Sequence, residues 1–516
     1  MALIRSIATV GGYTMISRVL GFVRDILIAA FLGAGPVADA FFVAFKLPNF
    51  FRRLFAEGAF NAAFVPLFAR HMSEGGADAA RRFAEEVMSV FVVFLLFFVT
   101  GLQISMPWLM HGFAPGFADD PYRHDLAVSL AQVTFPYLLF ISLASQLGGI
   151  MNGLGRFAAA AATPIILNLC LIAALLGLGS VLETPGHALA WGVAAAGAAQ
   201  FVWLIVSCHR AEFPLRLRAP KLTPGVKRLL ILMLPGAIGA GVVQINLLID
   251  VVIASLLPSG SVSFLYYADR VNQLPLGVIG VAVSIALLPL LSRQLRAGDE
   301  DEATGSLNRA LEFALLLTIP AAAALMIIPY PVIAVLFERG AFGPTETGAT
   351  AAALAAYALG LPAYVLIKVL GPGFFAREDT VTPVKIAAGC VVINLVLNLL
   401  LMGPFAHVGI ALATAISAWI NAALLVFMLR RRGHFRSDSR LRKAIPRMLF
   451  ASAAMAAAVG FTMENLAGYA AADPVQRMIA LVVVIAIGLA AFAAAALLFG
   501  AARREDIKRM LDRSAR

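Results

Sequence analysis

The chain contains fourteen apolar stretches separated by short polar breaks, and this pattern limits what it can fold into. A helix needs roughly 20 apolar residues to cross about 30 Å of hydrocarbon, and each stretch reaches that length. The composition, with 61% hydrophobic and 13% charged residues, excludes an ordinary soluble protein. In such a protein about 45–50% of the residues are apolar and about 25% are charged. The sequence predicts an all-α polytopic membrane protein with helices near 5–32, 36–70, 82–110, 124–152, 158–181, 187–209, 228–257, 262–294, 306–336, 347–374, 380–402, 407–430, 442–466 and 475–502.

The positive charges lie mostly on one side of this predicted arrangement. If the N-terminus is cytoplasmic, the inner breaks together with Arg5 carry 29 lysines and arginines, and the outer breaks carry three: Arg123, Arg339 and Arg477. Positive residues favour the cytoplasmic side, so this split predicts that both termini are cytoplasmic. It also accounts for the net charge of +11 without a nucleic-acid partner, and it places basic loops near the headgroups of membrane lipids.

A weak internal repeat divides the chain. Residues 61–76 resemble residues 284–299, and the alignment pairs Arg70 with Arg293 at an offset of 223. A second pair of similar segments lies later in the two halves. It pairs Arg156 with Arg377 and Pro164 with Pro383, at offsets of 221 and 219. Parallel repeats of this kind are typical of transporters, whose substrate site lies between the halves. We therefore expect two six-helix lobes and a terminal helix pair, at 1–215, 216–433 and 434–516.

Charged residues interrupt several of the apolar stretches. They are the basic residues Arg18, Arg24, Lys46, Arg52, Arg53, Arg270 and Lys368, and the acidic residues Asp25, Asp39, Glu57, Asp250 and Asp269. The seven bases would cost about 17–25 kcal/mol if they faced lipid near the bilayer centre, which exceeds a typical folding stability of about 5–15 kcal/mol. We expect them to face a hydrated cavity or to form internal ion pairs. Because the bases outnumber the acids, a cavity for an anion such as phosphate is favoured.

The second predicted helix carries a stripe of charge. Asp39, Lys46, Arg53 and Glu57 are separated by 7, 7 and 4 residues, so they share one helix face. The stripe rises about 27 Å, nearly the thickness of the hydrocarbon core. We expect it to line a cleft through the membrane, with Pro48 breaking the helix midway.

A second group of polar residues has the chemistry of a cation site. Asp250, Asn394, Asn398 and Thr414 offer oxygen atoms that suit a small cation such as sodium. Hydrogen bonding between helices by the two amides and the hydroxyl is the simpler interpretation.

Motifs for ATP hydrolysis or bond cleavage are missing from the sequence. It contains no GxxxxGK[ST], HExxH or GxSxG pattern. The adjacent Asp119 and Asp120 have no matching partners for an enzyme active site, and Cys170, Cys208 and Cys390 form no disulfide framework or zinc motif. We expect a transporter without a cofactor, driven by the membrane potential, a cation gradient or both.

Three segments resemble a known family. Residues 18–69 read RVLGFVRDILIAAFLGAGPVADAFFVAFKLPNFFRRLFAEGAFNAAFVPLFA, residues 266–275 read YYADRVNQLP, and residues 374–387 read FFAREDTVTPVKIA. They are similar to the MurJ/MviN family of bacterial lipid II flippases, within the multidrug/oligosaccharidyl-lipid/polysaccharide exporter superfamily. The family's fourteen-helix plan matches the full chain.

The resemblance implies a central cationic cavity between two lobes, and a groove for a polyprenyl tail on the last two helices. It implies that Arg24, Arg52 and Arg270 hold a pyrophosphate and that Asp39 and Glu57 orient these arginines or close a gate. The full expected substrate-binding set is Arg18, Arg24, Lys46, Asn49, Arg52, Arg53, Arg270 and Lys368, and the gating or orienting set is Asp25, Asp39, Glu57 and Asp269. Some members are thought to bind sodium in the second lobe, although here an asparagine stands where a second carboxylate is expected.

The resemblance also implies the function. We expect alternating-access flipping of lipid II, undecaprenyl-pyrophosphoryl-MurNAc-pentapeptide-GlcNAc, from the cytoplasmic to the periplasmic leaflet of the bacterial inner membrane. The expected partners are lipid II, membrane lipids and the peptidoglycan-synthesis machinery. The alternatives are a multidrug or other lipid-linked oligosaccharide exporter of the same superfamily, and an integral-membrane enzyme acting on polyprenyl phosphates.

Overall fold

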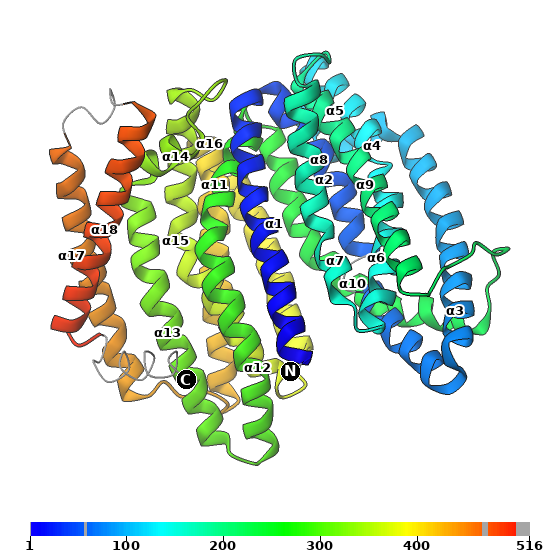
Figure 1. Cartoon of the computed structure of the whole chain (residues 1–516). Helices are drawn as coiled ribbons and strands as arrows, with labels where there is room; N and C mark the ends of the chain where they lie inside the picture. Colours follow the sequence, from blue (N-terminus) through cyan, green and yellow to red (C-terminus); the bar gives the residue numbers. More distant parts are fainter. Residues whose placement is uncertain (1, 56–58, 467–472, 502–516) are drawn as a thin grey trace. The chain divides into compact units, whose positions relative to one another are not determined.

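The regular structure of the chain is helical (Figure 1). The computed structural model describes residues 2–55, 59–466 and 473–501, and in these ranges the only extended pairing is one isolated bridge between Arg339 and Phe342. The prediction of an all-α polytopic protein is therefore confirmed. The chain folds into two compact units, residues 1–263 with 339–342, and residues 264–338 with 343–516. The lobe boundaries expected from the sequence repeat remain a prediction.

The N-terminal unit holds the first ten α-helices. They are α1 (Ala2–Leu32), α2 (Pro36–Phe55), α3 (Ala59–Ile104), α4 (Met106–Phe113), α5 (Pro121–Thr134), α6 (Tyr137–Gly153), α7 (Phe157–Ala161), α8 (Thr163–Leu178), α9 (Pro185–Arg210) and α10 (Pro224–Ser255). In this unit α2 packs against α5, α1 against α8, and α3 against both α6 and α10. These neighbours place the polar side chains of α1 and α2 beside helices that are distant in the sequence.

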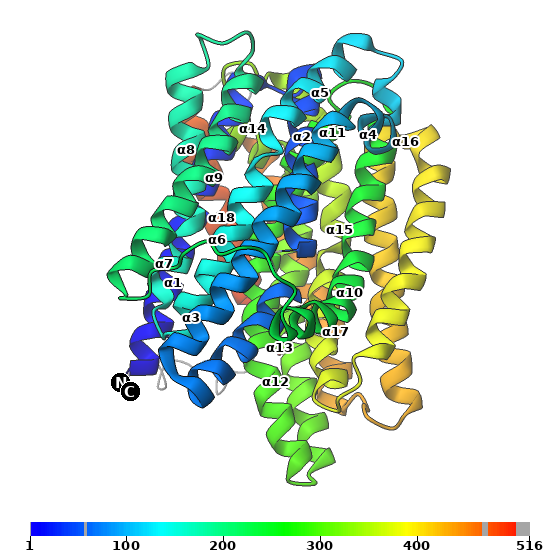
Figure 2. The same ribbon diagram turned by 90° about the vertical axis from the view of Figure 1, so that its right-hand side faces the viewer.

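The C-terminal unit begins within the next helix. Its helices are α11 (Ser261–Pro275), a π-helical turn (Leu276–Gly280), α12 (Val281–Arg296), α13 (Glu300–Ile327), α14 (Pro329–Phe337), α15 (Pro344–Phe375), α16 (Val381–Arg431), α17 (Ser439–Asn465) and α18 (Pro474–Leu498). Figure 2 shows α12 and α13 joined by a short turn into a hairpin. In this unit α15 packs between α13 and α16.

Two helices are too long to be single membrane crossings. α3 has 46 residues and α16 has 51, so at 1.5 Å per residue each would rise about 70–75 Å, more than twice the hydrocarbon core. Each contains a residue with positive φ where the direction changes, Gly76 at 71° and Ala406 at 46°. Behind the second bend, a Cβ on Gly409 would lie 2.2 Å from the Leu401 carbonyl oxygen, so only glycine fits there.

The predicted spans agree with the observed helices. Within the described residues, ten helical segments are long and apolar enough to cross a membrane. One of them, α16, covers two predicted spans, and α1, α2 and α10 cover the remaining three. Each of the fourteen predicted stretches thus corresponds to helix.

The last two helices pack side by side on α13 and α14 (Figure 1). Met448, Met455 and Val484 are buried in this contact. A polar clamp fixes the start of α17, since Arg309 pairs with both Glu312 and Asp438 and Arg440 pairs with Glu312 at 3.0 Å. The outward side of the pair exposes large apolar side chains, including Phe450, Phe461, Val482, Leu489 and Leu498.

Candidate functional site

The helix α2 carries five of the predicted site residues together with Pro48, which does not break it. The helix runs unbroken through Pro48 to Phe55, so the expected break is wrong. A proline leaves the carbonyl four residues earlier without its helical donor, here the carbonyl of Ala44. Thr134 Oγ1 lies 3.4 Å from that oxygen and 3.2 Å from the Ala131 oxygen, so α5 supplies a replacement donor.

Asp39, near the start of α2, is bound through both of its carboxylate oxygens. Its side chain is fully buried. Oδ1 accepts hydrogen bonds from the backbone N–H of Ser263 at 2.9 Å and from Ser263 Oγ at 2.6 Å. Oδ2 accepts from the N–H of Gly260 at 2.7 Å and from Arg123 Nη2 at 3.2 Å. Because Gly260 and Ser263 flank the start of α11, the carboxylate also lies at the positive end of that helix dipole.

Arg123 is a functional candidate that the sequence analysis missed. It was counted among three outer charges that report topology, whereas the structure places it on α5, buried and paired with Asp39. Its guanidinium also lies over the Phe117 ring, 4.2 Å from the ring centroid. A positive charge in a break that is predicted to lie on the outer side, against the general bias, is the signal that could have found it.

A second buried network joins α1 to α8. Arg24 Nη2 lies 2.7 Å from Asp25 Oδ1, and Arg24 Nη1 donates to Asn168 Oδ1 at 2.9 Å. The amide of Asn168 in turn donates to the Ser17 carbonyl at 2.9 Å, and the side chains of Arg24 and Asp25 are almost fully buried. Arg24 is therefore held in a fixed place by an acid and an amide, and Asn168 is a second residue that the sequence analysis missed.

The polar side chains in the second half of α2 are less buried than Asp39. Lys46, Asn49 and Arg52 are partly buried, and Arg53 is exposed. Asn49 donates to the Phe45 carbonyl at 2.8 Å, and Arg53 lies 3.4 Å from Gln244 Oε1 on α10. Glu57 lies outside the described residues. On α1, Arg18 is exposed.

The predicted residues of α11 and α15 lie in the C-terminal unit. Arg270 donates to Tyr266 Oη at 3.0 Å, and its guanidinium lies 4.9 Å from the centroid of that ring. Asp269 accepts a hydrogen bond from Gln273. Lys368, on α15, is exposed. Tyr266 thus orients Arg270 through both a hydrogen bond and its π-face.

The two asparagines of the predicted cation site are brought together. Asn398 donates to Asn394 Oδ1 at 3.0 Å, and Asn394 Nδ2 lies 3.5 Å from Thr414 Oγ1. Both amides are buried. Asp250 belongs to the N-terminal unit and the other three residues to the C-terminal unit. The observed bonds are those of interhelical packing, and a sodium site here remains a prediction.

Asp120, one of the two adjacent outer carboxylates, has a structural role. It precedes α5 and accepts a hydrogen bond from the N–H of Arg123 at 3.3 Å. A helix N-cap of this kind satisfies a backbone donor. It therefore gives no support to the enzyme alternative.

Comparison with known proteins identifies the family. A family model described as "Lipid II flippase MurJ" matches residues 28–473. The chain belongs to the MurJ family. A "Probable lipid II flippase MurJ" from Rhizobium meliloti is 48% identical to it over 521 residues, covering 100% of this chain and 97% of that protein. A "Lipid II flippase MurJ" from Burkholderia cenocepacia is 38% identical over 442 residues. This alignment covers 84% of this chain and 85% of that protein.

Solved structures agree with the MurJ assignment. A structure titled "Lipid II flippase MurJ, inward closed conformation" has a TM-score of 0.80 and 27% identity, covering 95% of this chain and 98% of that one. An inward-facing multidrug resistance MATE family transporter has a TM-score of 0.68 at 14% identity, covering 83% and 98%. At 14% identity, the similarity to the MATE family transporter shows a shared fold only. Together with the apolar helices, MurJ membership makes this chain a multi-pass membrane protein.

Proposed function

We propose that this MurJ family member flips lipid II from the cytoplasmic to the periplasmic leaflet by alternating access. It is a transporter rather than an enzyme. The observation that carries the proposal is the 48% identity, over the whole chain, with a relative described as a probable lipid II flippase. The arginines held in fixed positions on α1 and α11, Arg24 and Arg270, support it, because the substrate carries a pyrophosphate.

Arg24, Arg52 and Arg270 are proposed to bind the pyrophosphate. The planar guanidinium group makes paired hydrogen bonds to phosphate oxygens. Asp25 and Asn168 fix the position of Arg24, and Tyr266 fixes that of Arg270. Such preorganisation reduces the entropy lost when the ligand binds. Lys46, Arg53, Lys368, Arg18 and Asn49 complete the proposed polar surface.

Asp39 is proposed to control the conformational change. Through Gly260 and Ser263 it holds the start of α11, the helix that carries Asp269 and Arg270. Release of this contact would free α11 to move with its two charged residues. Asp269 and Glu57 are proposed to act with Asp39 as orienting or gating groups.

The driving force is proposed to be the membrane potential, a cation gradient or both, with no cofactor. An inside-negative potential favours outward movement of an anion by about 2.3 kcal/mol per charge per 100 mV. Asp250, Asn394, Asn398 and Thr414 are the proposed sodium ligands if a cation is coupled. The excess of positive charge in the inner loops supports an orientation with both termini in the cytoplasm of a bacterial inner membrane, where the peptidoglycan-synthesis machinery is a proposed partner.

Depletion of the protein from its host tests the function. Lipid II labelled at its headgroup should stop reaching the periplasmic leaflet, and unchanged exposure at the normal rate would reject the proposal. A sharper test uses Arg24→Ala, Arg52→Ala and Arg270→Ala in proteins that express and fold. Each should weaken both transport and binding of undecaprenyl pyrophosphate, whereas unchanged binding and transport would remove that residue from the site.

A further inference from the structure

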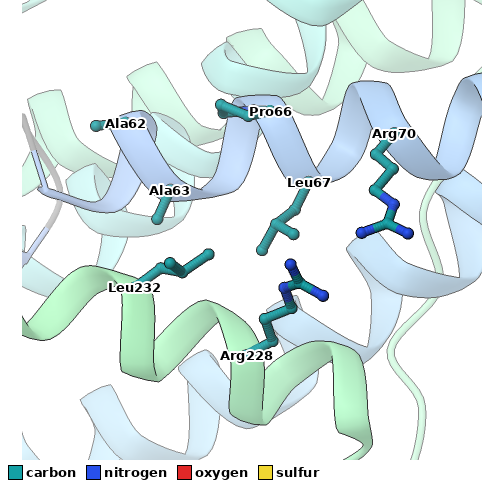
Figure 3. A pocket seen from close by; sticks show the side chains of 7 residues that line it. All are labelled: Ala62, Ala63, Pro66, Leu67, Arg70, Arg228 and Leu232. Atoms are coloured by element: carbon teal, nitrogen blue, oxygen red, sulfur yellow. The ribbon is translucent and has the colours of Figure 1, made fainter.

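A cavity of about 370 Å³ lies between the first part of α3 and the first turns of α10, both in the N-terminal unit. Figure 3 shows Arg70 of α3 and Arg228 of α10 with their guanidinium groups turned into the same space. Pro66, Leu67 and Leu232 form apolar walls beside them. None of these residues belongs to the pyrophosphate site proposed above.

The charge of this cavity is not balanced by its own residues. Arg70 Nε donates to Glu74 Oε1 at 2.8 Å, at a largely exposed position. No acidic side chain lines the cavity beside Arg228. The positive end of the α10 dipole is close by, since α10 starts at Pro224. The cavity lining has two guanidinium groups and no carboxylate, and Glu74 balances only the charge of Arg70, so the remaining positive charge favours an anion.

The cavity is amphiphilic along its length. It runs along α3 from Ala62 to Arg70, eight residues or about 12 Å of helix. The two arginines lie at one end, and Ala62 and Leu232 at the other. Beyond the apolar end, α10 exposes Leu234. This order of charge and apolar surface matches a lipid whose phosphate lies at the membrane interface and whose chains point toward the bilayer centre.

We propose that this cavity binds the headgroup of an anionic phospholipid of the inner leaflet. Its phosphate lies between Arg70 and Arg228, and its glycerol and first methylene groups contact Pro66, Leu67 and Leu232. Basic pockets between transmembrane helices on the cytoplasmic side have this chemistry. The volume suits a glycerophosphate group and is too small for a disaccharide that carries a pentapeptide. The side of the membrane follows from the orientation proposed above.

The test is phospholipid binding to the purified full-length protein in a neutral detergent, measured by native mass spectrometry during titration with phosphatidylglycerol or phosphatidylcholine. The unmodified protein should prefer phosphatidylglycerol. The double variant Arg70→Gln with Arg228→Gln should bind it roughly 20- to 30-fold more weakly, which corresponds to about 1 kcal/mol for each arginine. Since this measurement needs no transport, its failure is distinct from failure of the proposed flippase activity.

Lys227→Gln is the matched control, because Lys227 is exposed and adjacent to Arg228 but does not line the cavity. Its binding should change less than about twofold. Equal losses in control and double variant, or no preference for phosphatidylglycerol, would overturn the proposal. So would one-for-one displacement of phosphatidylglycerol by undecaprenyl pyrophosphate, which would assign the cavity to the transported lipid. If the glutamine pair does not fold, Arg70→Lys with Arg228→Lys keeps the charge, and the loss of the paired geometry should still weaken binding several-fold.

Discussion

Asp39 and Asp379 are bound by the same kinds of groups in two different parts of the molecule. Asp39 accepts hydrogen bonds from Arg123 and from the hydroxyl and N–H of Ser263 near the start of α11. Asp379 accepts from Arg432 and from the N–H of Thr382 at the start of α16. Each carboxylate therefore joins an arginine from elsewhere in the chain to the N-terminus of a helix.

Their surroundings differ. The Asp39 and Arg123 side chains are 0% and 6% exposed, whereas those of Asp379 and Arg432 are 21% and 37% exposed. Water can replace a lost partner at the second pair and not at the first. Removing one member of a buried pair leaves an uncompensated charge, which costs far more than the loss of an exposed contact. Burial, more than the bonding pattern, should therefore decide how much each aspartate contributes to stability.

The largest effect should come from Asp39→Asn. The amide cannot balance the buried charge of Arg123. Its NH₂ group, itself a donor, must also face one of the N–H or O–H donors that bind the carboxylate. We expect a loss of about 3–5 kcal/mol in the free energy of unfolding, measured by thermal or denaturant unfolding of the detergent-purified protein. Asp379→Asn is the matched control. Equal losses in the two variants would show that burial does not distinguish the two sites.

Arg24→Gln should have the second largest effect on stability. Arg24 is buried, but its acidic partner Asp25 is the next residue in the chain, so the pair joins no distant segments. The substitution removes charged hydrogen bonds to Asp25 and Asn168, each worth about 1.5–3 kcal/mol. We expect a destabilisation of about 2–3 kcal/mol and a loss of lipid II transport in reconstituted vesicles. Asn168→Ala is the companion variant, and it should lower stability while retaining the positive charge at Arg24. Full transport by Arg24→Gln would make the network purely structural.

Arg53→Gln should have a smaller effect on folding, since Arg53 is exposed and its contact with Gln244 is long at 3.4 Å. Exposed substitutions usually change stability by no more than about 0.5 kcal/mol. We expect an unchanged unfolding midpoint together with weaker binding of undecaprenyl pyrophosphate, measured by titration of the purified variant. A large drop in stability would mean that Arg53 belongs with the buried arginines.

These differences mark the limit of what the sequence predicts. The length of each apolar stretch is sufficient to predict its helix, because a chain in hydrocarbon must satisfy its backbone hydrogen bonds internally. Charge inside these stretches was also sufficient to select Arg24 and Asp39. Their partners Asn168 and Arg123 are 144 and 84 residues away, and only tertiary packing brings them together. The expected break of α2 at Pro48 has the same origin. The hydroxyl that donates to the Ala44 carbonyl belongs to Thr134 on α5, and the sequence does not reveal this contact.

Asp379→Asn should have a small effect on stability, and this effect should depend on pH. Partial burial would raise the pKa of Asp379, but hydrogen bonds from Thr382 and Arg432 outweigh it and lower the pKa from 3.8 to about 2. A carboxylate with a lowered pKa stabilises the fold above its unfolded value, and the contribution is lost as the pH falls through the folded value. We expect the variant to be less stable by about 0.2–1 kcal/mol at pH 7. The difference should stay constant down to about pH 5 and then shrink toward zero near pH 2, as followed by unfolding midpoints of the two proteins. A difference that is independent of pH over this range would attribute the loss to packing rather than to the charge of Asp379.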